Sequence, residues 1–321
     1  MEKSEDNLIA WIAGRFPEVD LPIGIGDDMA MLPASESGLL VTSDMLMDGV
    51  DFKTKVHSPE LIGRKALAVS LSDCAAMAVR PRWAMVSVAL PNGWTMEQAQ
   101  GLYLGIEALA REYECVIVGG DTNSWDHPLV VDVTVLAELW PGISPVRRTG
   151  AKVGDLICIT GELGGSLGGR HIRFTPLVRE AKWLAERLGG GLHAMMDLSD
   201  GLSVDAGRMA KASGVGIKLW KELTEATASH DAELAARDDG RSVLDHLLND
   251  GEDFELLFAV EARTWRAFME TPEGGEVAEK FGPMRARVIG EVIADAGLWL
   301  EGSDKLKTPI TPRGWRHFRA P

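Results

Sequence analysis

The stretch SPELIGRKALAVSLSDCAAMAVRPRWAMVSVALP, residues 58–91, joins a predicted helix directly to a predicted strand. Ser58-Pro59-Glu60 provides an N-cap, a proline at the first helical position and an acid in the first turn. The apolar residues that follow extend this helix to about Met77. The run from Trp83 to Leu90 is then typical of a buried strand. A helix and a strand in direct succession indicate a chain that mixes the two.

Strands and helices continue on both sides of this stretch. Thr95 and Gln98 form a capping box for a helix to about Tyr113, and another helix follows Thr175-Pro176. An N-terminal helix capped by Ser4 is also expected. Strands are predicted at residues 38–46, 115–119, 129–139, 155–160, 214–220, 254–260, 287–293 and 298–301. Because the order lacks the regular alternation of a doubly wound nucleotide-binding fold, we expect the α+β class.

A change of composition divides the chain into two halves. Its 321 residues favour two domains over one. The segment WPGISPVRRTGAKVG, residues 140–154, is rich in proline, glycine and basic residues, as linkers often are. We therefore predict an N-terminal domain of residues 1–145 and a C-terminal domain of residues 146–321, each a mixture of strands and helices.

Charge and cysteine content narrow the partners and the compartment. Forty-eight acidic against 33 basic residues give a formal charge of −15, which argues against a partner that is nucleic acid or an acidic membrane. Cys74, Cys115 and Cys158 are odd in number and lack C-x-x-C spacing. A disulfide framework and a zinc site are therefore unexpected, and a cytoplasmic location fits best. No apolar run approaches the roughly 20 residues that a membrane helix needs.

Aspartate recurs at the ends of apolar strands or beside glycine. A carboxylate there can bind a hard cation, and a small neighbour lets a phosphate approach the backbone. Asp, Gly and Ser are also common turn residues, so one such cluster alone is more often a turn. Five of the same type favour a magnesium–phosphate site: Gly26-Asp27-Asp28, Thr42-Ser43-Asp44, Ser72-Asp73, Gly119-Gly120-Asp121 and Asp197-Leu198-Ser199-Asp200-Gly201.

Other phosphate-binding signatures do not occur in the sequence. It contains no P-loop, no G-x-G-x-x-G after a strand and no protein-kinase motifs. The glycine-rich segment TGELGGSLGG, residues 160–169, has two interpretations: its amides wrap phosphates, or it is a plain loop. The histidines show no H-E-x-x-H pairing, which argues against catalytic zinc.

At these residues the chain resembles the thiamine-monophosphate kinases, members of the superfamily that includes aminoimidazole ribonucleotide synthetase. The matching stretches follow the family's order from residue 24 to residue 318, and only about Lys221 to Asp245 has no match. They are GIGDDMAML, VTSDMLMDGVDF, IGRKALAVSLSDCAAMAVRPRWAMVSVALP, VGGDTN, RRTGAKVGDLICITG, MDLSDGLSVDAGRMAKASGVGI, GEDFELLF and GWRHF.

The resemblance implies transfer of the γ-phosphoryl group of ATP, the co-substrate, to the phosphate of thiamine monophosphate. Several Mg²⁺ ions would bridge the reactants. Such chemistry is physically consistent with the aspartates, because an anionic nucleophile that attacks an anionic donor needs neutralising charge. The resemblance also implies a homodimer in which the N-terminal domains form a β-barrel-like sheet assembly.

Carried over by motif, the resemblance gives each site residue an expected role. The metal ions would be held by Asp28, Thr42, Ser43, Asp44, Asp73, Asp121, Asp197 and Asp200, of which Asp44, Asp121 and Asp200 are the expected catalytic residues. ATP would contact Gly120, Asp121, Arg148 and Ser199. The acceptor would contact Asp51, Glu252 and Trp315.

The acceptor side departs from the family pattern. Asp51 stands where the family usually has histidine, and Asp250-Gly251-Glu252-Asp253-Phe254 replaces Gly-Gly-Glu-Asp-Tyr. Two alternatives stay open: an ATP-dependent synthetase or ligase of the same superfamily, and a non-catalytic nucleotide-binding paralogue. The lack of an N-terminal cysteine-bearing or glycine-rich arm argues against a selenophosphate synthetase. The complete set of acids argues against the paralogue.

Overall fold

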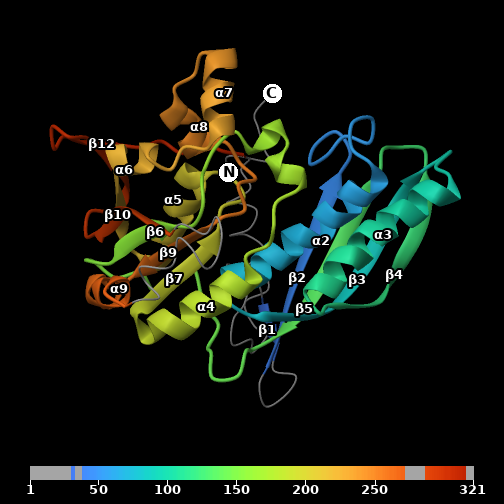
Figure 1. Cartoon of the computed structure of the whole chain (residues 1–321), viewed down its shortest axis with the longest axis horizontal. Coiled ribbons are helices and arrows are strands. Elements are labelled where there is room, and N and C mark those ends of the chain that lie inside the picture. The colour runs from blue at the N-terminus through green and yellow to red at the C-terminus, as the bar shows by residue number, and fades with distance from the viewer. Residues whose placement is uncertain (1–29, 33–37, 272–285, 316–321) are drawn as a thin grey trace, which may run out of the picture.

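The chain folds into two mixed α/β domains that lie side by side (Figure 1). The computed structural model describes residues 30–32, 38–271 and 286–315. One domain holds a five-stranded sheet and the other a seven-stranded sheet. The predicted helix at Ser4 and the predicted metal ligand Asp28 lie outside the described residues.

The first sheet has the strand order β1-β2-β5-β3-β4. Neighbouring strands are antiparallel except β3 and β4, which are parallel. Inward residues of β5 are valine or alanine and fully buried, and polar residues such as Asp132 and Thr134 alternate with them, as the sequence predicted. The strands are β1 (Ala30–Leu32), β2 (Leu39–Met47), β3 (Arg80–Pro91), β4 (Val116–Trp125) and β5 (Val130–Glu138).

One expectation about this sheet was wrong. The strand predicted at residues 115–119 continues to Trp125, so Asp121 lies within β4 rather than at a strand end. Asp44 likewise lies within β2. The sheet is also open within the chain, not a closed barrel.

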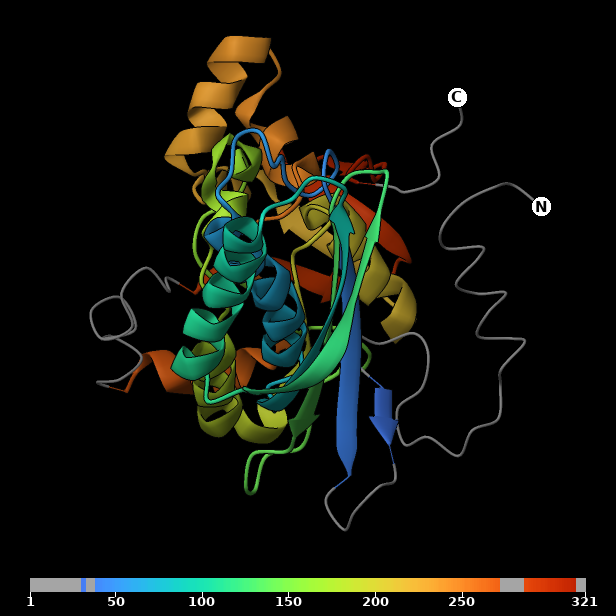
Figure 2. The ribbon, with the colours of Figure 1, turned by 90° about the vertical axis from the view of Figure 1, so that its right-hand side faces the viewer.

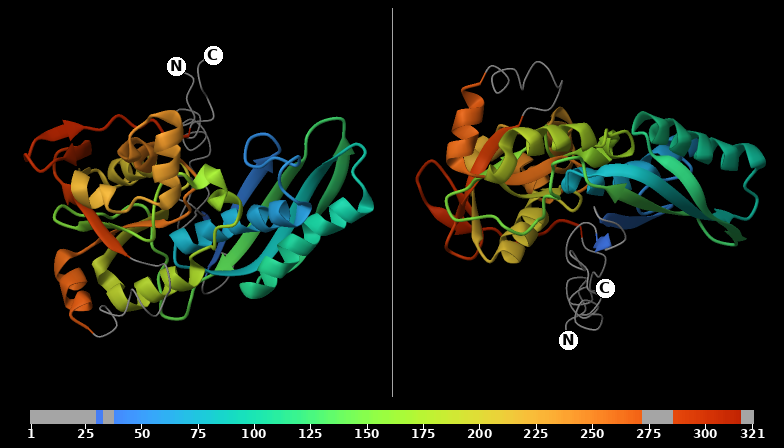
Figure 3. Two further views of the ribbon diagram at one scale, coloured as in Figure 1. Left: turned by 45° about the horizontal axis from the view of Figure 1, so that its top comes forward. Right: turned by 90° about the horizontal axis from the view of Figure 1, so that it is seen from below.

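Helices α2 (Pro59–Ala76) and α3 (Met96–Glu112) cover one face of the first sheet (Figure 2). Both predicted caps are confirmed: the Ser58 side chain accepts from the amide of Leu61, and Thr95 and Gln98 form a capping box. In the views of Figures 2 and 3, no helix of the described residues covers the opposite face.

The second sheet has the order β12-β11-β8-β10-β6-β9-β7. Helices α4 (Val178–Leu188) and α9 (Ala262–Met269) pack on one face, and α5 (Leu202–Ser213) and α8 (Val243–Asn249) on the other. The helix α6 (Lys221–Glu225) contacts β8, β10 and α8, and α7 (His230–Asp239) contacts α8. The strands are β6 (Leu156–Ile159), β7 (Leu192–Asp197), β8 (Gly216–Trp220), β9 (Leu256–Val260), β10 (Arg287–Ile293), β11 (Gly297–Glu301) and β12 (Lys307–Pro309).

Strand β9 shows that both faces of this sheet carry apolar side chains that must pack against helices. All five of its side chains are buried. Leu256, Phe258 and Val260 enter one core with α4 and α9, whereas Leu257 and Ala259 enter the other with α5 and α8. Helix α4 begins at Val178, without a side-chain cap, so the expected cap at Thr175-Pro176 was wrong by two residues.

Helix α2 joins the two domains through a shared core. Its apolar residues contact the first sheet and α3, and they belong to the same buried cluster as residues of α4 and β9 (Figure 1). The three free cysteines are buried. Within the described ranges, no helix has both the length and the apolar character to cross a membrane.

Two glycines let α2 and α3 approach closely. A Cβ atom at Gly63 would lie 1.9 Å from the carbonyl oxygen of Leu102, and one at Gly105 would lie 1.9 Å from that of Glu60. Both contacts would be with backbone atoms, which cannot move away by a change of rotamer. The separation of the helices therefore depends on the absence of a side chain at these positions.

We predict that Gly105→Ala lowers the free energy of unfolding by about 1–3 kcal/mol, because overpacking outweighs the better helix propensity of alanine. Chemical denaturation monitored by circular dichroism measures this change. Gly190→Ala is the matched control, since nothing lies within 4 Å of a Cβ atom there. Equal stability of the two variants would contradict the prediction.

Candidate active site

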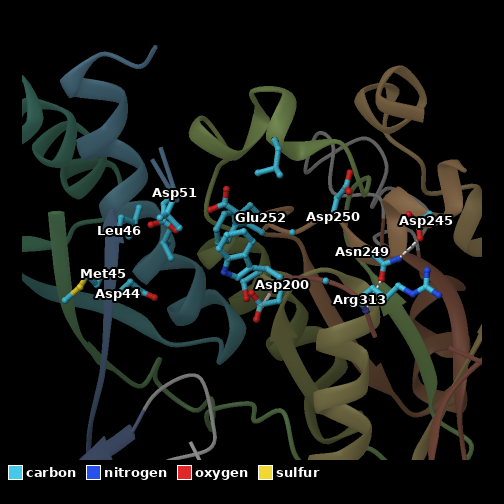
Figure 4. Close-up of a pocket in the computed structure, with 18 of the residues that line it drawn as sticks. Asp44, Met45, Leu46, Asp51, Asp200, Asp245, Asn249, Asp250, Glu252 and Arg313 are labelled. Carbon is cyan, nitrogen blue, oxygen red and sulfur yellow. Dashed lines mark hydrogen bonds between the residues drawn. The ribbon is translucent and has the colours of Figure 1, made fainter. Parts of the chain in front are cut away.

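A cavity of about 600 Å³ lies between the two domains (Figure 4). The first domain lines it with residues of β2, the following turn and α2, among them Asp44 and Asp51. The second domain contributes Ser199 and Asp200 from the loop after β7, and Glu252 from the loop before β9. Asp44 and Asp51 face Glu252 and Asp200 across this space. Residues predicted for metal, ATP and acceptor therefore line one cavity.

Helix α2 holds three of the predicted metal ligands. Ser70 donates to Asp44 at 2.6 Å, and Ser72 donates to Asp197 at 2.7 Å. Asp73, on the same helix, accepts from the hydroxyl of Thr42. These contacts bring ligands from β2, α2 and β7 to a single turn of the helix. Ser70 and Ser72 are buried; the sequence reasoning missed Ser70 and named Ser72 only as the neighbour of Asp73.

Asp200 is fixed by the first turns of α5. Arg208 donates to its carboxylate, and its own amide donates to Asp205 at 3.0 Å. Asp205 is fully buried, and burial raises the pKa of its carboxyl. Asp205 and Arg208 lie in the quoted motif MDLSDGLSVDAGRM, yet nothing in their spacing marked them as supports for the neighbouring aspartate.

The segment that carries Trp315 is attached to the same loop. The amide of Trp315 donates to the carbonyl oxygen of Asp200 at 3.0 Å. A Cβ atom at Gly314 would lie 1.9 Å from that oxygen, so only glycine fits. The Trp315 side chain lines the cavity and is 39% exposed. It is thus placed where an aromatic ligand could stack on it.

The acceptor-side residues Asp51 and Glu252 meet at a buried lysine that the sequence reasoning missed. The ammonium group of Lys65 donates to the carbonyl oxygen of Asp51 at 2.5 Å and to Glu252 at 2.6 Å. Burial raises the pKa of Glu252, and the charge of Lys65 opposes that rise. The Asp51 carboxylate accepts from the amide of Met47 at 2.7 Å. Glu252 has φ +62°, a rare conformation for a residue with a side chain.

The glycine-rich loop after β6 does not offer all its amides to a phosphate. The amide of Gly164 donates to both oxygens of Asp253 at 3.0 Å, and that of Gly165 donates to Asp250 at 2.9 Å. Burial raises the pKa of Asp253 to about 7, although Arg170 also donates to it at 2.6 Å. For these two amides, the phosphate-wrapping interpretation is wrong.

Three predicted ATP-side residues lie away from the cavity. Arg148 lies in the connection between the domains, where its carbonyl oxygen accepts from Ser213 at 3.3 Å. Gly120 and Asp121 are exposed on β4, three strands from β2. Asp121 is paired with Ser87, on the sheet face opposite α2 and α3. A single chain therefore does not bring Asp121 to Asp44.

The predicted ligands fit magnesium in chemistry, since all are oxygen donors of Asp, Ser or Thr. Within the described residues, no three His, Cys, Asp or Glu side chains are already grouped to hold an ion. Instead Asp44, Asp73 and Asp197 are hydrogen-bonded to hydroxyl groups. The structure thus places these carboxylates close to a common helix without forming a complete cluster.

Comparison with known proteins agrees with the two-domain fold. The models of the AIR synthase related protein match at residues 26–139 for its N-terminal domain and 160–301 for its C-terminal domain. The thiamine-monophosphate kinase of Rhodopirellula baltica is 37% identical over 98% of this chain and 97% of that protein.

Solved structures are similar over nearly the whole chain. The structure of AaThiL complexed with AMPPCP and TMP has a TM-score of 0.81 and 28% identity, covering 98% of this chain and 97% of that one. The thiamine-monophosphate kinase of Stenotrophomonas maltophilia has a TM-score of 0.70 and 31% identity, with 93% and 96% covered. By its sequence over nearly full length, the chain belongs to the thiamine-monophosphate kinase family.

Proposed function

We propose that this chain transfers the γ-phosphoryl group of ATP to thiamine monophosphate in a magnesium-dependent reaction, giving thiamine diphosphate and ADP. One observation carries the proposal: Asp44, Ser199 and Asp200 line the same interdomain cavity as Asp51, Glu252 and Trp315. The relatives support the choice of substrates, because the similar AaThiL structure contains AMPPCP and TMP.

The acceptor phosphate is itself the nucleophile, so the reaction needs no nucleophilic side chain. It needs positioning and neutralisation of charge on the phosphoryl oxygens. Trp315 would stack on a ring of the acceptor, and the carboxylates of Glu252 and Asp51 would favour its cationic thiazolium. Magnesium, when bound, neutralises the phosphate charge. It would be held by the predicted set that includes Asp44, Asp73, Asp197 and Asp200.

The two halves of the chain have separate tasks in this proposal. Residues 1–145 bind Mg-ATP and dimerise, and residues 146–321 complete the active site. Strand β5 ends at Glu138 and β6 begins at Leu156, so this boundary falls in the connection between the two sheets. A cytoplasmic location agrees with the buried thiols of the described chain.

We further propose that a second copy covers the open face of the first sheet. Cross-strand pairing puts Met45, Asp132, Ser87 and Asp121 in one row on this face. Met45 and other apolar side chains there are exposed, Met45 at 62%. Exposed apolar surface on a sheet with open edges is typical of an interface.

The same arrangement would complete the ATP side. Asp121 and Asp44 are separated by three strand spacings, roughly 14 Å in total. Among the described residues, β1 pairs only with the first part of β2, Leu39 to Val41, and no strand pairs with the outer edge of β4. If β4 of one protomer lies beside β2 of the other, Asp121 approaches Ser43 of its partner on the open face, next in sequence to Asp44.

The first test of the function is direct. Purified protein with ATP, Mg²⁺ and thiamine monophosphate should form thiamine diphosphate and ADP, and EDTA should abolish both products. Asp44→Asn keeps the shape but removes a ligand charge, so turnover should fall by about two orders of magnitude. Exposed Asp304→Asn is the control. ADP without thiamine diphosphate would favour a synthetase or ligase, and neither product would favour the non-catalytic paralogue.

The dimer proposal predicts complementation between inactive variants. In a heterodimer of Asp44→Asn and Asp121→Asn subunits, one of the two shared sites has both aspartates. Subunits mixed at random should therefore recover about a quarter of the native turnover. Recovery near zero, or sedimentation equilibrium showing only a monomer, would contradict the shared site.

The attachment of Trp315 is tested through Gly314→Ala. The added Cβ atom would meet the Asp200 carbonyl oxygen at 1.9 Å, so the segment must shift. The acceptor KM should rise at least tenfold, as for Trp315→Ala, in line with about 1–3 kcal/mol of lost stacking. The KM for ATP should change much less. Gly207→Ala is the control, because its Cβ atom would lie 3.7 Å from Pro312, an ordinary contact with the same segment.

A further inference from the structure

Lys65 is a buried cation whose hydrogen-bond partners among the described residues belong to the two walls of the cavity. Its side chain has no exposed surface, and it does not line the cavity itself. Burial of an ammonium group is costly unless hydrogen bonds and an opposite charge compensate it. Here the carbonyl oxygen of Asp51 and the carboxylate of Glu252 provide that compensation, at 2.5 and 2.6 Å.

The two partners come from different domains. Asp51 lies in the turn after β2, and Lys65 lies on α2 of the same domain. Glu252 comes from the loop before β9, 187 residues after Lys65 in the chain. One ammonium group therefore fixes the distance between a first-domain turn and a second-domain loop.

The backbone of Glu252 adopts an unfavourable conformation. Its φ of +62° is unfavourable for a residue with a Cβ atom, so other contacts must maintain it. Its amide donates to the carbonyl oxygen of Ser199 at 2.7 Å, and its carbonyl oxygen accepts from Ser166 at 2.5 Å. These contacts fix the backbone. The position of the carboxylate depends on Lys65.

We propose that Lys65 is a positioning residue for the acceptor, because it sets the Asp51 turn and the Glu252 carboxylate at one distance across the cavity. This inference rests on the proposed function, in which both partners face thiamine monophosphate. Since the lysine has no exposed surface, it acts through its partners and does not touch the substrate. Its loss should weaken acceptor binding more than ATP binding.

The test compares Lys65→Met with Glu252→Gln and with the double variant. Each single variant should raise the acceptor KM about tenfold or more and change the KM for ATP less than about twofold. If Lys65 acts through Glu252, the double variant should resemble one single variant rather than the product of both effects. The double variant also removes the uncompensated charge, so it guards against failure of Lys65→Met to fold.

Lys218→Met is the matched control. Lys218 also pairs with two carboxylates, Glu291 at 2.8 Å and Glu301 at 3.0 Å, but away from the cavity. Its replacement should leave both KM values unchanged. Equal increases in both KM values for Lys65→Met, or multiplied effects in the double variant, would overturn the inference.

A second measurement does not depend on the acceptor. Hydrogen–deuterium exchange should become faster at residues 47–57 and 250–254 in Lys65→Met, and not in Lys218→Met. Unchanged exchange in both segments would overturn the positioning role even if the protein proved inactive on thiamine monophosphate. Conversely, inactive wild-type protein with faster exchange in the variant would reject the substrate assignment and retain the role of Lys65 at the cavity.

Discussion

The structure depends on the burial of α2 between the two domains. Twelve residues of this helix are buried, including Lys65, Ser70 and Ser72. A polar group buried this deeply must find a partner, because an unsatisfied one costs free energy of the order of 1–3 kcal/mol. Each finds it in a residue of the candidate site: Glu252, Asp44 and Asp197 respectively. The hydrogen bonds that satisfy the buried polar groups of the helix thus also orient the residues of the site.

Negative charge dominates the site built in this way. Aspartates converge from β2, α2 and the loop after β7, and two of the cations beside them are held by carboxylates, Arg208 by Asp200 and Lys65 by Glu252. A polyphosphate would meet repulsion in such a cavity unless cations accompanied it. In the proposed reaction, magnesium would supply the positive charge that the already paired Arg208 and Lys65 do not supply.

The sequence indicated local features well and long-range ones poorly. Caps at Ser58 and Thr95 depend on residues three positions apart, and both were predicted correctly. The burial of Lys65 depends on a residue 187 positions away, and a lysine in an apolar helix gives no local sign of its partner. The aspartate motifs indicated which residues carry chemistry. They could not show that Asp121 lies three strands from Asp44 and on the sheet face opposite α2, because this follows from the strand order and the pairing register.

The departure from the family at Asp51 becomes understandable from the contacts of Lys65. The lysine binds the backbone carbonyl oxygen of Asp51, which any residue at this position would supply. The Asp51 carboxylate instead accepts from the amide of Met47 and so closes its own turn. The contact of Lys65 with the first domain therefore does not depend on which side chain stands at position 51. Its contact with the second domain does depend on a side chain, the carboxylate of Glu252. A substitution at position 51 would therefore preserve the hydrogen bond from Lys65. Residue 252, by contrast, must carry a carboxylate to pair with Lys65.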